Sequence, residues 1–148
     1  MIPLSNKDKK KIIEKLNEQF GVFEIPYLII QFGKEKLRIY SGSLSKEELW
    51  KIDKGLRVEN IGLYFAKWEE DEIRLTIDGV QLLKNQITKN ILEIDDKQAD
   101  LWLRGNDLDI KTSYGWKVLK NNSEFLGCGE STGEKISNFV PKERRIKN

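Results

Sequence analysis

Apolar residues in the first part of the chain recur at a spacing that predicts an amphipathic helix over residues 5–21. The residues on the expected buried face are Ile12, Ile13, Leu16 and Phe20. Ser5 or Asn6 can cap the start of this helix with a side-chain oxygen, and Gly21 can end it because glycine adopts a left-handed conformation without steric penalty. The pattern therefore predicts a helix that packs one face onto a core.

The following segments have the patterns of strands and a second helix. Residues 27–33 are a short apolar run, typical of a buried strand, and residues 36–42 alternate between apolar and polar positions. Their tight connection predicts a β-hairpin. A capping box formed by Ser45 and Glu48 predicts that a helix follows. Two more strands joined by an acidic turn are expected over residues 61–68 and 72–77.

The pattern changes after residue 77. Asp78 can cap a short helix in residues 78–87, and brief apolar segments follow, separated by turn residues at intervals of about ten. The expected strands are residues 91–94, 99–105, 115–121, 124–130 and 135–141. This spacing is typical of a small barrel or sandwich. The sequence therefore predicts an α+β protein, with an α/β domain over residues 1–74 packed rigidly on a mostly β domain over residues 75–148.

Charge is nearly balanced over the whole chain. The 148 residues include 26 Lys and Arg and 24 Asp and Glu, a formal net charge of +2, so a surface for a polyanion must come from local clustering. Lysines crowd the first turns of the expected N-terminal helix, and a second basic cluster lies at the C-terminus. Abundant Lys, Glu and Ile are also typical of thermophile proteins.

Residues that the chain lacks exclude several kinds of site. There is no histidine, which removes the commonest general base and metal ligand, and the single Cys128 has no histidine to activate it. A zinc site and a disulfide framework are excluded. Residues 127–133, GCGESTG, are followed by an extended stretch and not by the helix of a dinucleotide fingerprint, so their glycines are expected to permit turns or close backbone contact. We therefore expect no catalytic residues, metal or cofactor.

No part of the sequence indicates membrane insertion or export. No apolar run approaches the roughly 20 residues of a membrane span, and lysines occupy the place of a signal-peptide core. We expect a cytoplasmic protein with no membrane partner.

The C-terminal half resembles a PUA domain, the RNA-binding module first described in pseudouridine synthases and archaeosine transglycosylases. Residues 78–85, DGVQLLKN, resemble its opening helix, and residues 101–110, LWLRGNDLDI, resemble its R/K-G-x-D-L element. Residues 114–131 resemble the strand pair that ends in an L-G-x-G step. Residues 138–146, NFVPKERRI, are similar to the N-x-x-P-K-x-x-R ending of PUA modules attached to Sun-family RNA cytosine-5 methyltransferases. The first 74 residues are similar to the pre-PUA domains of archaeal and eukaryal ribosome-biogenesis proteins.

The resemblance implies a pseudobarrel of about six strands that binds RNA along one face and the adjoining helix. Its implied RNA-binding residues are Lys84, Lys89, Arg104, Tyr114, Trp116, Lys142, Arg144 and Arg145. The C-terminal basic residues suit phosphates, because arginine binds them with bidentate geometry. Tyr114 and Trp116 suit stacking on unpaired bases. The alternatives are that Trp102 and Trp116 pack in the core, and that Lys84 and Lys89 are ordinary solvated lysines.

Three functions remain open on the sequence. The first is a non-catalytic protein that binds structured rRNA or tRNA in ribosome biogenesis or RNA modification. The second is an adaptor that recruits an RNA methyltransferase or a ribosome-assembly or maturation factor. The third is a small hydrolase or transferase that uses carboxylates between the two halves, against which the absent histidine and motifs argue.

Overall fold

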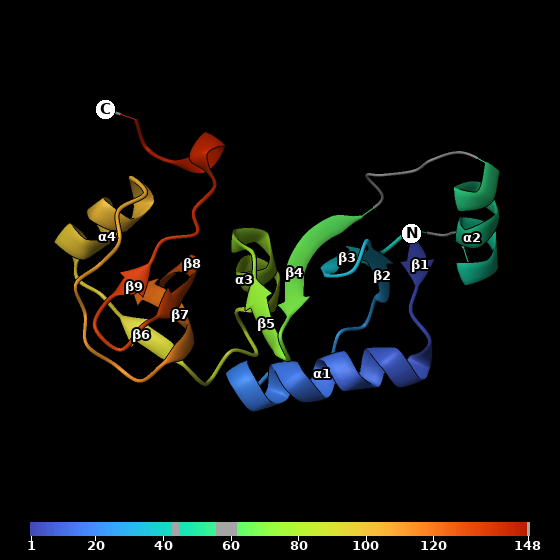
Figure 1. Ribbon diagram of the computed structural model, residues 1–148, viewed down its shortest axis with the longest axis horizontal. Coiled ribbons are helices and arrows are strands. Elements are labelled where there is room, and N and C mark those ends of the chain that lie inside the picture. Colours follow the sequence, from blue (N-terminus) through green and yellow to red (C-terminus); the bar gives the residue numbers. More distant parts are fainter. Residues whose placement is uncertain (43–44, 56–61, 148) are drawn as a thin grey trace.

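The chain folds into two sheets with helices packed around them (Figure 1). The computed structural model describes residues 1–42, 45–55 and 62–147. The first sheet has five strands in the order β1-β2-β3-β4-β5, and the second has four in the order β6-β7-β8-β9. The expected α+β fold is confirmed.

Helix α1 (Asn6–Phe20) forms where the apolar spacing predicted it. The Ser5 side chain accepts a hydrogen bond from the backbone N–H of Asp8, and Gly21 ends the helix at a φ of 87°. Ile12, Leu16 and Phe20 are its buried residues, so one face of α1 packs onto the five-stranded sheet. The prediction for this helix and both of its caps is confirmed.

The five-stranded sheet is antiparallel throughout. Its strands are β1 (Ile2–Pro3), β2 (Leu28–Phe32), β3 (Lys36–Tyr40), β4 (Leu63–Glu69) and β5 (Glu72–Leu75). The predicted hairpin is β2 and β3, with Leu28 opposite Tyr40 and Phe32 opposite Lys36. The strand expected from residue 61 starts at Leu63, and Ile61 itself lies outside the described residues.

Helix α2 (Lys46–Gly55) begins with the predicted capping box. The Ser45 hydroxyl accepts a hydrogen bond from the backbone N–H of Glu48 at 3.1 Å, and the Glu48 carboxylate accepts one from the backbone N–H of Ser45 at 3.4 Å.

Helix α3 (Ile77–Leu83) begins earlier than the sequence predicted. Its cap is Thr76, whose hydroxyl accepts a hydrogen bond from the backbone N–H of Gly79 at 3.0 Å. The prediction that Asp78 caps this helix is therefore wrong, because Asp78 already lies in the first turn. The carboxylate there is still favourable, since the N-terminus of a helix carries partial positive charge.

The second sheet contains β6 (Ile91–Glu93), β7 (Gly115–Asn121), β8 (Glu124–Ser131) and β9 (Ile136–Ser137). Strands β6 and β7 are parallel, and the other pairs are antiparallel. An isolated bridge joins Leu108 to Ile136. Within the described residues this gives four strands and one bridge, where the resemblance implied about six strands.

The main difference is helix α4 (Asp96–Leu103), which occupies most of the segment expected as a strand over residues 99–105. Asp95 and Gln98 form a capping box: the Asp95 carboxylate accepts from the backbone N–H of Gln98 at 2.8 Å, and the Gln98 side chain accepts in return at 2.9 Å. Ala99 and Trp102 lie three residues apart and are the buried positions. The strand prediction was wrong because this cap and this helical spacing were overlooked.

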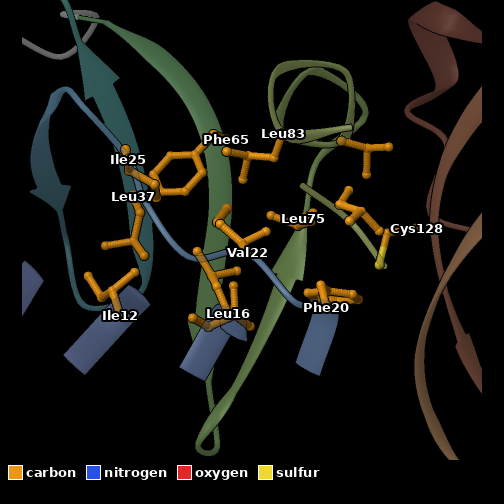
Figure 2. Close-up of a cluster of buried hydrophobic side chains, with 14 of the residues drawn as sticks. Ile12, Leu16, Phe20, Val22, Ile25, Leu37, Phe65, Leu75, Leu83 and Cys128 are labelled. Carbon is orange, nitrogen blue, oxygen red and sulfur yellow. The ribbon is translucent and has the colours of Figure 1, made fainter. Parts of the chain in front are cut away.

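Two hydrophobic clusters fill the interior. The larger lies between α1 and the five-stranded sheet and continues into the second sheet (Figure 2). Figure 2 shows Cys128 of β8 at its edge, beyond Leu75 and Phe20. The smaller cluster joins the second sheet to α4 and contains Trp102 of α4, Leu119 of β7 and Ile136 of β9. Strand β7 supplies residues to both clusters, so it connects the two halves of the molecule.

Candidate nucleic-acid interface

The candidate interface is built around the C-terminal segment, residues 138–146, which follows β9. Asn138 fixes the start of this segment. Its side-chain amide donates to the carbonyl oxygens of Trp102 at 2.8 Å and Asn106 at 2.9 Å, and its oxygen accepts from the backbone N–H of Val140 at 2.8 Å. Its own backbone N–H donates to the Asp107 carboxylate at 2.8 Å. The segment is therefore tied to the end of α4 before its basic residues begin.

The two arginines of this segment point to different elements. The 3-10 turn Lys142–Arg144 comes first, and Arg144 Nη1 lies 2.9 Å from Asp78 Oδ1 of α3. Arg145 Nε instead donates to the Val140 carbonyl at 2.9 Å, and its side chain covers Gly105, where a Cβ would lie 2.5 Å from Nε. The segment thus bridges α3 and α4, as its position across the top of the second half in Figure 1 also shows.

Lys142 and Arg104 complete the basic residues at this end. Lys142 is exposed, and its side chain has no hydrogen-bond or ion-pair partner among the described residues. Arg104 ends α4, and its Nε lies 3.0 Å from Asp100 Oδ2. Because Arg145 covers the adjacent Gly105, the structure brings Arg104 and the C-terminal basic residues together from positions about 40 residues apart in the sequence.

The two lysines near α3 differ in their surroundings. Lys84 directly follows α3 and is exposed. Lys89 Nζ donates to the Asn17 carbonyl at 3.2 Å, in the last turn of α1. A lysine at a helix C-terminus is favourable because the last carbonyls are unsatisfied and carry partial negative charge. Lys89 therefore has a structural partner already.

Tyr114 and Trp116, the two aromatic residues expected to stack on bases, differ in their exposure to solvent. Trp116 is only 6% exposed and packs in the larger cluster, which agrees with the alternative that it is a core residue. Trp102 is fully buried and donates from Nε1 to the Leu126 carbonyl at 3.0 Å. Tyr114 is 81% exposed, in an open groove whose lining includes Glu72 and Glu130. Two neighbouring carboxylates disfavour an RNA backbone beside Tyr114.

Sequence reasoning missed a cleft between the two halves, with a volume of about 90 Å³. Arg74 of β5 and Phe139 line it, and the Arg74 guanidinium lies 5.0 Å from the Phe139 ring centroid and 5.9 Å from that of Trp116. Phe139 and Trp116 meet edge to face at 5.1 Å. Within the described residues the Arg74 guanidinium has no hydrogen-bond or ion-pair partner, so its N–H groups are available to a ligand. No sequence signal joins Arg74 to Phe139, because they are about 65 positions apart.

Two perturbed groups help to define what the site can do. Burial raises the pKa of the Cys128 thiol to about 12, so this cysteine stays protonated and is a poor nucleophile near neutral pH. The hydrogen bond from the Asn138 backbone N–H lowers the pKa of Asp107, and Lys135 lowers it further. Asp107 therefore stays ionised and holds the C-terminal segment.

No group of three or more potential metal ligands occurs in the described residues, and none of the described helices is long and apolar enough to cross a membrane.

Comparison with known proteins finds a family model that resembles the C-terminal part of the chain. Residues 89–146 match a family model described as the PUA domain of methyltransferase RsmF. A ribosomal RNA small subunit methyltransferase F from Aeromonas salmonicida is 22% identical over 150 residues, which cover 95% of this chain and 29% of that protein. The chain therefore spans less than a third of that relative, and the matched family model describes its PUA domain and not a catalytic domain.

Two further matches are a solved structure and a protein of a different description. A crystal structure of a hypothetical protein from the hyperthermophilic archaeon Pyrococcus horikoshii OT3 matches with a TM-score of 0.57 at 14% identity, covering 93% of this chain and 92% of that chain. That likeness shows the fold alone. A capsular polysaccharide biosynthesis protein CapD from Staphylococcus aureus is 28% identical over 142 residues, covering 86% of this chain and 24% of that protein. The family model that matches residues 89–146 describes an RsmF PUA domain and not a capsular polysaccharide protein.

Proposed function

We propose that this chain, a PUA-domain protein related to the PUA modules of Sun-family RNA methyltransferases, binds structured rRNA or tRNA without catalysing a reaction. Its place would be ribosome biogenesis or RNA modification in the cytoplasm. The observation that carries the proposal is the C-terminal segment, which gathers basic side chains at the ends of α3 and α4. We further propose that residues 1–74 and 75–148 are its two domains.

The proposed RNA contacts divide by their chemistry. Lys142 and Lys84 are exposed lysines that suit phosphate oxygens as point charges. Arg144 and Arg145 already have protein partners at one edge of the guanidinium, and arginine has five N–H donors, so each retains donors for a phosphate. Arg104 adds positive charge at the end of α4. For Lys89 and Trp116 we propose a supporting role, since one is bonded to α1 and the other is buried.

Arg74 and Phe139 extend the proposed interface into the cleft. Phe139 is 40% exposed, and Arg74 lies against its ring and forms no ion pair among the described residues. An arginine beside an exposed aromatic ring suits an unpaired nucleotide, because the base can stack while the phosphate meets the guanidinium.

A salt titration of RNA binding tests the proposal. The probes are total tRNA and rRNA fragments, and the variant is the double charge reversal Arg144→Glu with Arg145→Glu. We expect wild-type log K to fall steeply with log salt and the variant to have a flatter slope, by roughly 0.7–0.9 for each phosphate that the variant no longer binds. The matched control Lys34→Glu with Lys97→Glu makes the same change in net charge at exposed positions outside the proposed RNA-binding residues.

One control separates a direct effect on RNA binding from a disturbed structure. Arg144→Glu places a carboxylate beside Asp78, which repels it and can loosen the C-terminal segment. Lys142→Gln removes a charge that has no partner among the described residues, so its effect reports on RNA alone. Equal slopes for wild type, the double variant and Lys142→Gln would refute the proposed interface.

A second function is favoured by one observation, the groove at Tyr114. An exposed tyrosine next to Glu72 and Glu130 suits a basic segment, since a ring and carboxylates both attract a cation. The chain would then act as an adaptor that recruits an RNA methyltransferase or maturation factor. Binding of an arginine-rich peptide that is abolished in Tyr114→Ala, with no RNA binding by wild type, would favour the adaptor.

A further inference from the structure

A second basic surface lies in the N-terminal half, away from the C-terminal segment. The first turns of α1 and the helix α2 form one end of the long axis of the molecule, whereas α4 and the C-terminal segment form the other (Figure 1). Two grooves on this surface are lined by four lysines of α1 and α2, Lys9, Lys10, Lys46 and Lys51, against two acidic residues, Glu14 and Glu47. None of the four lysines has an ion-pair partner among the residues that the structure describes, although the chain as a whole is nearly balanced in charge.

Lys9 and Lys46 come from different helices and lie close to each other. The Lys9 ammonium donates to the Tyr27 carbonyl at 2.7 Å, which fixes its position. Burial lowers the pKa of Lys9, and the neighbouring charge of Lys46 lowers it further. Two ammonium groups whose charges interact repel each other, and a bound anion would relieve this repulsion.

Phe23 provides an aromatic platform on the same surface. The ring is 64% exposed and lines a groove of about 520 Å³ together with Lys9 and Lys10. We call this the Phe23 groove. Asn6 and Asn17 add amide groups that can donate and accept hydrogen bonds, and Glu14 is the acidic residue of the described lining.

The loop that carries Phe23 is held in place by Gln86. The Gln86 side-chain oxygen accepts from the backbone N–H groups of Phe23 at 2.9 Å and Glu24 at 3.0 Å, and its amide donates to the Glu24 carbonyl at 3.0 Å. The backbone under an exposed aromatic ring is therefore fixed before any ligand arrives. Such preorganisation lowers the entropy cost of stacking a ligand on the ring.

We propose that the Phe23 groove and the adjoining lysines of α2 form a second RNA-contact surface, which takes an unpaired stretch of the same RNA. This inference rests on the proposed function, because it assumes that RNA is the ligand. Proteins that bind single-stranded nucleic acid combine basic residues along the phosphate backbone with aromatic side chains on which the bases stack. An acidic protein would match the lysines but would leave the exposed Phe23 ring without a role.

The two surfaces together predict a dependence on RNA length. A short strand reaches one surface, whereas a strand long enough to span the long axis of the molecule engages both. The second contact is then intramolecular, so affinity rises more than the added length alone would give.

The test measures binding of fluorescent oligouridines of graded length to wild type and five variants, each as the full chain, and one of these is Arg144→Glu/Arg145→Glu. Phe23→Ala is expected to weaken binding of the long strand about tenfold, and Phe23→Trp to retain it, because stacking needs only a ring. Lys10→Gln, Lys46→Gln and Lys51→Gln together should reduce the salt slope by about 2, which is three phosphates at ~0.7 each. The matched control Lys34→Gln, Lys97→Gln and Lys111→Gln removes the same charge and should leave binding near wild type.

The outcomes separate this inference from the proposed function. Unchanged binding in both Phe23→Ala and the lysine variant, with binding abolished in Arg144→Glu/Arg145→Glu, would overturn the second surface and leave the proposed function standing. No binding of any RNA by wild type would overturn both. If polyglutamate displaced oligouridine and bound with the same dependence on Phe23, the ligand would be an acidic protein and the RNA assignment would be wrong.

Discussion

Replacing Asn138 by alanine tests whether the C-terminal segment is held by the hydrogen bonds of this one side chain. The change removes three bonds, to Trp102, Asn106 and Val140, at 2.8–2.9 Å. A net hydrogen bond contributes about 1 kcal/mol, and water can replace part of it because Asn138 is half-buried. We expect the free energy of unfolding to fall by about 2–3 kcal/mol.

Urea denaturation followed by tryptophan fluorescence measures this change, with the m-value as a check that the transition itself is unaltered. Asn138→Asp is the closest variant, because its oxygen still accepts from Val140 but it cannot donate to the two carbonyls. It should lose at least as much stability as alanine, since a carboxylate would face two carbonyl oxygens. Asn85→Ala, at an exposed asparagine whose side chain has no partner among the described residues, is the control and should change little.

The same variant makes a prediction about RNA. Asn138→Ala removes no charge, yet it frees the segment that positions Arg144 and Arg145. RNA affinity should therefore fall together with stability. A loss of stability below about 0.5 kcal/mol, with unchanged RNA affinity, would refute the reasoning that Asn138 holds the segment.

Two further predictions concern packing and pH. Gly79→Ala should lower the melting temperature and destabilise the fold by about 1–3 kcal/mol, because a Cβ there would overlap the Phe65 carbonyl where α3 crosses β4. At an exposed helical glycine the same change would leave the melting temperature unchanged or raise it, and that result here would contradict this packing. Asp107 has a lowered pKa, so its contribution to stability is present above the unfolded value of about 3.9 and is lost as pH falls through the folded pKa. Denaturation of wild type and Asp107→Asn should differ most near neutral pH and converge below about pH 4, whereas a difference independent of pH would show that Asp107 does not act through its charge.

The sequence predicted best where one local signal decided the structure. Ser5 and Gly21 bound α1 as expected, and the Ser45–Glu48 capping box starts α2. Segments whose pattern fits two structures were less certain. Residues 99–105 have apolar positions that suit a strand by alternation, but the Asp95–Gln98 capping box makes the segment a helix.

The candidate site was less accessible to sequence reasoning because its parts meet only through the fold. The basic C-terminal cluster was visible as a run in the sequence. That Arg144 contacts Asp78 and Arg145 covers Gly105 depends on where α3 and α4 lie. Trp116 is of a residue type that suits stacking, yet β7 turns it inward. Arg74 and Phe139 meet across the boundary between the two sheets, and no pattern along the chain reports such a contact.

The buried cluster that crosses this boundary affects how the module can be transplanted. The family match begins at residue 89, but Val118 and Cys128 of the matched part pack in one cluster with Leu16 and Leu75, which precede it. The segment recognised by its sequence is therefore smaller than the part of the chain that shares its hydrophobic core. A chimaera that joins residues 89–146 to another enzyme would expose this apolar face, and it would need a host surface that replaces α1 and β5.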